Sequence, residues 1–247
     1  SKESHLAFTT NKLSQQKVVV SEFRNKKNKK VILKLGQKLD VVPDYSFPVL
    51  SWHPIGDVLS VFYEYRGDLY WMTYNLITKE KIKTKLFQFE KILDANYSSN
   101  GRKIALSAVV KGKTDIYVLD VSSRSQEQIT NDYYDDRYPI FINNSKDIVF
   151  SSNREDNSME VGGNRNVVYA HSSDLFMYSY SNKKNFYYSP QILRRVTKTP
   201  FANEKMPVRL SKNKIRYLSD ANGIYNEWEA VLDSGVAFVD TVIHYRY

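Results

Sequence analysis

The stretch Asp57-Val58-Leu59-Ser60-Val61-Phe62-Tyr63 decides the fold, because three later stretches of the chain repeat its plan. Ile104 lies 46 residues after Val58, and Ile148 lies 44 residues after Ile104. Each stands in a short, almost wholly apolar run that follows a turn. These runs cover residues 57–63, 102–108, 146–152 and 213–219. A fixed period in this range predicts a repeat architecture in which one small unit recurs along the chain.

The repeat at residues 46–86 shows the internal plan of one unit. Its second strand is apolar at both parities, so neither face of that strand can look at water. The fourth alternates lysine with less polar residues, which is typical of an outer edge protected against pairing with another chain. The expected strands are residues 47–52, 58–63, 69–74 and 81–86. This gradient from buried to lysine-rich strands predicts an all-β fold, a β-propeller of about five recognisable four-stranded blades.

We expect one propeller domain over residues 1–247, because all-β domains of this length commonly stay undivided. The opening segment supplies only three strands, near residues 6–10, 17–23 and 31–35, so its blade lacks an innermost strand. Either sequence upstream is missing, or the C-terminal run closes the ring. Residues 153–173 form an insertion, expected to be a loop or disordered. The last repeat ends in an apolar run at residues 236–247. The expected blades cover approximately residues 1–44, 45–88, 89–131, 132–198 and 199–247.

Composition removes several classes of function. The chain has no cysteine, which excludes disulfides and thiolate chemistry, and its apolar runs are far too short to span a bilayer as helices. The net charge is +9, but the lysines are scattered, so nucleic acid is not the expected partner. One dense basic run, residues 24–30, is interpreted as a solvated hairpin turn, with a phosphate or lipid contact as the alternative. Without a starting Met or a signal core, we interpret the sequence as a mature or excised segment.

Catalytic and metal-binding patterns are missing from the sequence. The four histidines are isolated; His53 is expected to bond backbone within a turn. No Gly-x-Ser-x-Gly elbow and no phosphate-binding glycine loop occur. Asp132, Asp135 and Asp136 could form a calcium or acid/base cluster, but an Asx-type turn explains them at lower cost. The sequence therefore predicts a protein that is not an enzyme and that needs no cofactor and no metal.

Tyrosines and arginines beside one inter-blade turn are the candidate partner-binding residues. Tyrosine combines a large contact area with a polar group at low entropic cost, although most tyrosines of a propeller pack between blades. Those near the turn at residues 131–139 are the better candidates for recognition. The candidate set is Tyr133, Tyr134, Arg137 and Arg154.

The segment from Asp120 to Arg154 resembles the repeats of TolB-like propellers. The matching residues are Gln128-Ile129-Thr130-Asn131-Asp132, Asp136 with Pro139, and Ile148-Val149-Phe150-Ser151-Ser152-Asn153-Arg154, with an echo at Tyr217-Leu218-Ser219-Asp220. The resemblance is specific in two repeats and covers approximately residues 46–230 by pattern. It departs from the family at the Ser-Pro-Asp-Gly-Lys turns, which here begin at His53, Ser98 and Asn143.

The resemblance implies a docking platform that does no chemistry. TolB-like propellers are usually six-bladed and periplasmic, so five repeats suggest a fragment of a larger envelope protein. We expect a periplasmic or outer-membrane-associated scaffold that binds another envelope protein, as part of a transport or surface-assembly complex. Two alternatives stay open. The chain could be a regulatory or substrate-gating propeller of a peptidase whose catalytic domain lies elsewhere, or it could bind a small molecule or glycan in a central channel.

Overall fold

A computed structural model describes residues 5–12, 15–24, 28–36, 46, 48–155, 157, 159, 172–181, 192–233, 235–239 and 243–246. The chain divides into two compact units, and each is described by itself. The first contains Ser1–Lys113 and Tyr117–Glu127; the second contains Thr114–Ile116 and Gln128–Tyr247. The regular elements of the described residues are strands, with short 3-10 turns at η1 (Asn143–Ser145) and at residues 180–181. None of the described helical segments is long or apolar enough to cross a membrane.

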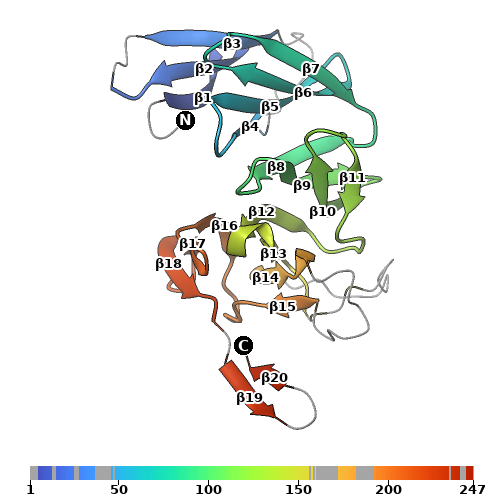
Figure 1. The fold of residues 1–247 in the computed structure, drawn as a ribbon, viewed down its shortest axis with the longest axis vertical. Coiled ribbons are helices and arrows are strands. Elements are labelled where there is room, and N and C mark those ends of the chain that lie inside the picture. Colours follow the sequence, from blue (N-terminus) through green and yellow to red (C-terminus); the bar gives the residue numbers. More distant parts are fainter. Residues whose placement is uncertain are drawn as a thin grey trace. The chain divides into compact units, whose positions relative to one another are not determined.

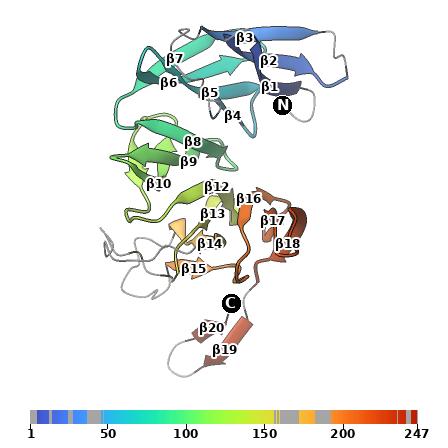
Figure 2. The same ribbon diagram turned by 180° about the vertical axis from the view of Figure 1, so that it is seen from behind.

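The strands pair into consecutive antiparallel sheets, coloured in chain order in Figure 1 and seen from behind in Figure 2. The first sheet consists of β1 (His5–Lys12), β2 (Gln15–Glu22) and β3 (Lys29–Gly36). The next consists of β4 (Val49–Trp52), β5 (Val58–Tyr65), β6 (Asp68–Asn75) and β7 (Lys81–Leu86). The third consists of β8 (Lys91–Tyr97), β9 (Lys103–Val110), β10 (Lys113–Asp120) and β11 (Gln126–Gln128). All three are simple meanders in which strands adjacent in sequence are adjacent in space.

The later sheets follow the same rule. The fourth consists of β12 (Asp136–Ile142), β13 (Asp147–Ser152), β14 (Asp174–Tyr178) and β15 (Leu193–Arg195). The fifth consists of β16 (Glu204–Arg209), β17 (Lys214–Ser219) and β18 (Asn226–Val231). The all-β fold and its order of blades are therefore as predicted, including the three strands of the first sheet.

The C-terminal run forms a separate two-stranded hairpin of β19 (Gly235–Val239) and β20 (Ile243–Arg246). The fifth sheet is therefore three-stranded, with β18 at its edge. The predicted insertion at residues 153–173 lies largely outside the described residues.

The strand that decided the fold is buried on both faces, as its sequence predicts. In the first unit, Leu59, Val61 and Tyr63 of β5 pack into one apolar cluster with Val18 and other residues of the first sheet. Phe62, on the opposite face of β5, packs into a second cluster with residues of the third sheet. The lysine-rich strand β7 lies at the sheet edge, with Lys81, Ile82 and Lys83 exposed. The blade is thus covered on both faces and open at its rim.

The tight turns use the residues that their geometry requires. Arg66 and Gly67, between β5 and β6, both have positive φ, at 58° and 84°. Lys111 and Gly112 repeat the arrangement between β9 and β10, at 52° and 74°. Two successive residues of positive φ define the hairpin turn that matches the twist of the strands, and glycine adopts that conformation without steric cost.

Candidate functional site

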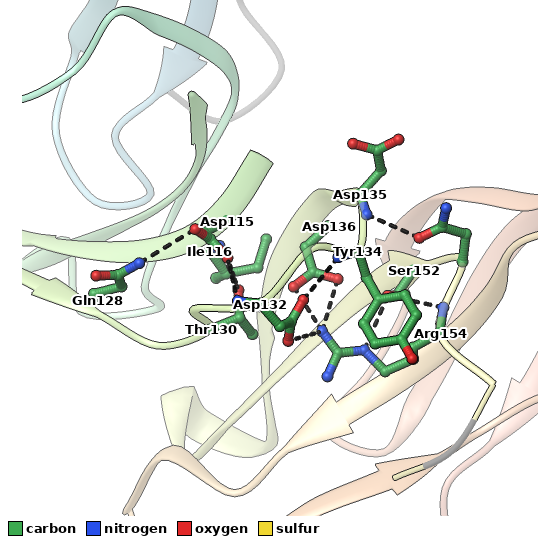
Figure 3. Close-up of polar contacts among 11 residues, drawn as sticks. Asp115, Ile116, Gln128, Thr130, Asp132, Tyr134, Asp135, Asp136, Ser152 and Arg154 are labelled. Carbon is green, nitrogen blue, oxygen red and sulfur yellow. Dashed lines mark hydrogen bonds and ion pairs between the residues drawn. The ribbon is translucent and has the colours of Figure 1, made fainter. Parts of the chain in front are cut away.

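The predicted turn between β11 and β12 is a network of buried polar groups, and Figure 3 shows its members. We name it the first junction: Asp115 and Ile116 of β10, residues 128–136, Ser152 and Arg154, all in the second unit. Ile116 N donates to Thr130 Oγ1 at 2.9 Å. Asp115 Oδ1 accepts from Asp132 N at 3.3 Å, and Asp115 Oδ2 accepts from Gln128 Nε2 at 3.2 Å. Side chains of the third strand thus complete the hydrogen bonds of the backbone that leads into the next blade.

Arg154 is the counter-ion of this junction. Its Nη2 donates to Asp132 Oδ2 at 3.1 Å and to Asp136 Oδ2 at 2.7 Å, while its Nε donates to Ser152 Oγ at 2.9 Å. The exposed fraction is 1% for Arg154, 3% for Asp132 and 0% for Asp136. A buried ion pair stabilises only when its charged groups are well hydrogen-bonded, and the guanidinium bonds to both carboxylates and to Ser152 here.

Aromatic rings hold the guanidinium in place. The Arg154 Cζ lies 5.4 Å from the centre of the Tyr134 ring, and Figure 3 shows that ring beside the guanidinium. The rings of Phe150 and Phe176 lie at 5.5 and 5.6 Å. A cation near ring faces gains electrostatic attraction where water is excluded. The side chain is therefore fixed by packing as well as by its ion pairs.

The charges of the first junction do not balance when every carboxyl is ionised. Burial raises the pKa of Asp136 to about 6; the positive charge of Arg154 opposes this rise, and the negative charge of Asp132 adds to it. Burial opposes the charge of Arg154 too, but Asp136 and Asp132 hold the guanidinium pKa above its ordinary value. Asp115, Asp132 and Asp136 place one carboxylate oxygen each within 4.8 Å of the others. The Arg154 guanidinium supplies a positive charge beside two of these carboxylates, Asp132 and Asp136, so the cluster contains its own cation.

A second junction, between β15 and β16, repeats this design residue by residue. Leu175 N donates to Thr197 Oγ1 at 2.8 Å, as Ile116 N does to Thr130. Thr199 N donates to Asp174 Oδ1 at 3.3 Å, as Asp132 N does to Asp115. Asn203 N donates to Asp220 Oδ1 at 2.5 Å, and Asp135 N donates to Asn153 Oδ1 at 2.8 Å. Glu204 therefore occupies the position of Asp136, and its pairing with Ser219 matches that of Asp136 with Ser152.

The two junctions place their cation differently. The position of Arg154 is taken by Ala221 in the second junction, two residues after the strand end. The position of Gln128 is taken by Arg195, whose Nη2 lies 2.8 Å from Asp174 Oδ2. Glu204, 1% exposed, accepts from Thr199 Oγ1 at 2.9 Å, and burial raises its pKa. The two junctions thus share their backbone hydrogen bonds, but the arginine pairs with different carboxylates: Asp132 and Asp136 in the first junction and Asp174 in the second.

Both junctions lead into a bulged first strand that carries a basic residue. The sequence Asp136-Arg137-Tyr138-Pro139 in β12 is matched by Glu204-Lys205-Met206-Pro207 in β16. The register of pairing shifts after Arg137 and after Lys205. Tyr138 and Met206 have φ of 55° and 52°. Proline cannot donate to the ladder, and a bulge redirects the neighbouring side chains.

These basic residues line one pocket of the second unit, with a volume of ≈ 400 Å³. Arg137 Cζ lies 5.0 Å from the centre of the Tyr138 ring. Lys205 Nζ lies 3.5 Å from the centre of the Tyr225 ring. The remaining lining is polar: Thr114, Asp135, Ser151, Asn153, Ser172, Ser173 and Asn203. We name it the Arg137–Lys205 pocket.

The four partner-binding candidates predicted from the sequence lie in different settings in the structure. Arg137 lines the Arg137–Lys205 pocket, whereas Tyr133 and Tyr134 are half-buried outside it. Arg154 is buried and serves as an internal counter-ion, so in this conformation it offers no surface to a partner. Sequence reasoning missed Lys205 and Tyr225. The matching tetrapeptides at 136–139 and 204–207 were the signal that could have found Lys205.

Asp132 and His53 behave as the sequence predicts. Asp132 Oδ1 accepts from Tyr134 N at 3.0 Å, which is an Asx-type turn. In the first unit, His53 Nδ1 accepts from Gly56 N at 2.9 Å, and its ring meets that of Tyr97 edge-on at 5.1 Å. Burial lowers the pKa of His53. The imidazole is therefore a structural part of its turn.

Comparison with solved structures defines the class of the fold. TolB from Acinetobacter baumannii superimposes with a TM-score of 0.67 at 15% identity, over 93% of this chain and 50% of that one. Prolyl oligopeptidase B from Galerina marginata gives 0.58 at 10% identity, over 92% and 32%. An oligogalacturonate lyase in complex with manganese gives 0.55 at 14% identity, over 89% and 55%. No family model and no curated protein matches the sequence.

The chain therefore has a TolB-like β-propeller fold, as its blade pattern and its resemblance predicted. It spans half the length of the TolB chain. The same fold occurs here in structures named as enzymes and in TolB, so the fold alone does not assign an activity.

Proposed function

We propose that this chain is a non-catalytic docking module that binds an extended segment of another protein at the Arg137–Lys205 pocket. The observation that carries the proposal is the pairing of two cation–aromatic couples, Arg137 with Tyr138 and Lys205 with Tyr225, around ≈ 400 Å³ of polar space. Arginine and tyrosine are enriched at the centres of protein interfaces. The similarity of the fold to TolB supports a scaffold role.

The lining suggests the chemistry of the bound segment. Arg137 and Lys205 outnumber the one carboxylate of the pocket, Asp135. Hydroxyl and amide groups supply hydrogen bonds for a polar backbone, and the two tyrosines offer flat apolar surface. A segment with an acidic side chain and an exposed backbone complements this surface in charge and hydrogen bonding. We further propose that the partner is an envelope protein and that the module works in the periplasm or at the outer membrane, within a transport or surface-assembly complex.

Site-specific photocrosslinking in the organism that encodes the chain tests the proposal. A benzoylphenylalanine at Tyr225, which is 45% exposed, should capture one discrete protein. The same group at Ile55, which is 72% exposed in the turn between β4 and β5, should capture none. Lys205→Glu should abolish the adduct, whereas Lys212→Glu, an exposed lysine outside the pocket, should leave it unchanged. Absence of a Tyr225 adduct, or an adduct that survives Lys205→Glu, would contradict the proposal.

The competing proposal is a regulatory or substrate-gating propeller of a peptidase. The similarity to prolyl oligopeptidase B, of which this chain covers 32%, favours it. The complete gene separates the two proposals. A flanking Gly-x-Ser-x-Gly or His-Glu-x-x-His segment would support the peptidase, because those patterns supply an activated serine or a zinc site. A flanking domain without either pattern would support the docking module.

A further inference from the structure

Two hairpin turns of the first unit lie side by side. One joins β2 to β3 and the other joins β6 to β7. A cavity of ≈ 80 Å³ is lined by Glu22 and Asn28 of the first turn and by Leu76 and Lys79 of the second. Lys81 Nζ also donates to the Ile32 backbone oxygen at 2.7 Å, which joins the start of β7 to β3. The described residues of these two turns and of the strands beside them, which we name the paired turns, therefore form one surface. Arg24, Lys29 and Lys30 on it belong to the basic run that the docking proposal leaves unexplained.

This surface is basic. Arg24, Lys29, Lys30, Lys79 and Lys81 are all exposed, against the carboxylates of Glu22 and Glu80. Lys30 Nζ and Lys81 Nζ lie 5.6 and 5.9 Å from the centre of the same ring, Tyr74. Ammonium groups held by a shared ring keep a positive potential at this surface, which attracts anions within a Debye length.

Large apolar side chains stand beside these charges. Phe23, next to Glu22, is 66% exposed, and Ile77, next to Leu76, is 73% exposed. Val31 of β3 and Ile82 of β7 are 40% and 50% exposed. Exposure of large apolar side chains to water is unfavourable in free energy. Basic residues interleaved with exposed apolar ones are typical of surfaces that rest on an anionic bilayer, where the charges meet headgroups and the apolar groups enter the interface.

We propose that the paired turns bind an anionic phospholipid surface, with Phe23 and Ile77 entering the interface and the basic residues contacting headgroup phosphates. Free phosphate is a poorer match, since the small cavity between the turns is lined by the Glu22 carboxylate. This surface shares no residue with the Arg137–Lys205 pocket, so the proposal stands or fails independently of the docking function.

The chain has no cysteine, so single cysteines labelled with the environment-sensitive dye NBD give an unambiguous test. Labels at Phe23→Cys and Ile77→Cys should brighten with vesicles of equimolar phosphatidylcholine and phosphatidylglycerol, and not with phosphatidylcholine alone. A label at Ile224→Cys, 67% exposed in the second unit, is the matched control and should not respond. Cosedimentation of the unlabelled chain should show the same lipid preference.

A double variant and a control measure the contribution of the basic residues to vesicle binding. Arg24→Gln with Lys29→Gln should weaken vesicle binding roughly 25-fold, since each basic residue near an anionic surface contributes roughly fivefold. Lys212→Gln, an exposed lysine of the second unit, should leave it unchanged. Excess inorganic phosphate should compete no better than chloride of equal ionic strength. Equal binding to neutral vesicles, an unresponsive label at both positions, or specific competition by phosphate would each overturn the proposal.

Discussion

Arg154→Ala tests most directly whether Arg154 is the counter-ion of the first junction. The change removes the donor of four hydrogen-bonding contacts, to Asp132, to both oxygens of Asp136 and to Ser152. It leaves two carboxyl groups buried without a positive partner from this residue. Ala221 occupies the equivalent position of the second junction, where Arg195 pairs with Asp174. The variant places alanine at the same position of the first junction, which has Gln128 in place of that arginine.

The expected loss of stability in Arg154→Ala has a constant part and a part that depends on pH. Lost packing and hydrogen bonds cost about 2–3 kcal/mol, whatever the pH. In the wild type, the pKa of Asp136 is raised from 3.8 to about 6, so stability falls as the pH rises through that window and then levels off. Without Arg154 the carboxyl stays protonated to higher pH, and stability keeps falling by about 1.4 kcal/mol per pH unit. The variant should therefore be less stable by about 2–3 kcal/mol near pH 5 and by about 4–5 kcal/mol near pH 7.5.

Hydrogen exchange of the β12 and β13 amides is the appropriate assay, because it reads the second unit separately from the first. Arg154→Ala with Asp136→Asn is the control; it should remove the added pH dependence while keeping the constant loss. A destabilisation under about 1 kcal/mol that is equal at both pH values would show that Arg154 is not the counter-ion of these carboxyl groups, since removing one partner of a buried ion pair costs more than that.

Three further substitutions have expected outcomes in denaturant unfolding. Gly101→Ala should destabilise the first unit by about 2–4 kcal/mol, because a Cβ there would lie 2.0 Å from His53 Nε2 and φ is +70°. Gly112→Ala is the control: with φ +74° and no atom within 4 Å of its Cβ, it should cost only about 1 kcal/mol. Equal losses in the two variants would contradict this account. Thr130→Val should cost about 1–3 kcal/mol by leaving the buried Ile116 N–H without its side-chain acceptor, and an unchanged unfolding midpoint would argue against that hydrogen bond.

The fold could be predicted from the sequence because the patterns that specify its strands and turns lie within short stretches of the chain. A strand that is apolar at both parities, such as residues 58–63, has to be covered on both faces, and the structure covers β5 in that way. The turn at Arg66-Gly67 needs positive φ, which glycine favours and which the structure shows. The end of the chain was less predictable. Both strands of the C-terminal hairpin lie within one apolar run, and composition alone does not show where such a run turns back.

The candidate site was predictable only in part, because its contacts join residues distant in sequence. The Asx-type turn at Asp132 is local, and the sequence identified it correctly. The partner of that carboxylate, Arg154, is 22 residues away and follows a strand end, so the sequence placed it among surface contacts. The position of Arg137 in the pocket likewise depends on a bulge whose register no pattern of hydrophobicity records.

The two junctions suggest why the blades have diverged so far in sequence while keeping one geometry. The backbone needs Thr130 or Thr197 and Asp115 or Asp174 at fixed positions, because these side chains bond specific amides. The compensating cation has no such constraint. It only has to approach one of the carboxylates, so it can come from Arg154, which follows β13, or from Arg195 in β15. Charge balance is a property of the cluster as a whole, and a substitution that moves the cation leaves each hydrogen bond of the backbone in place.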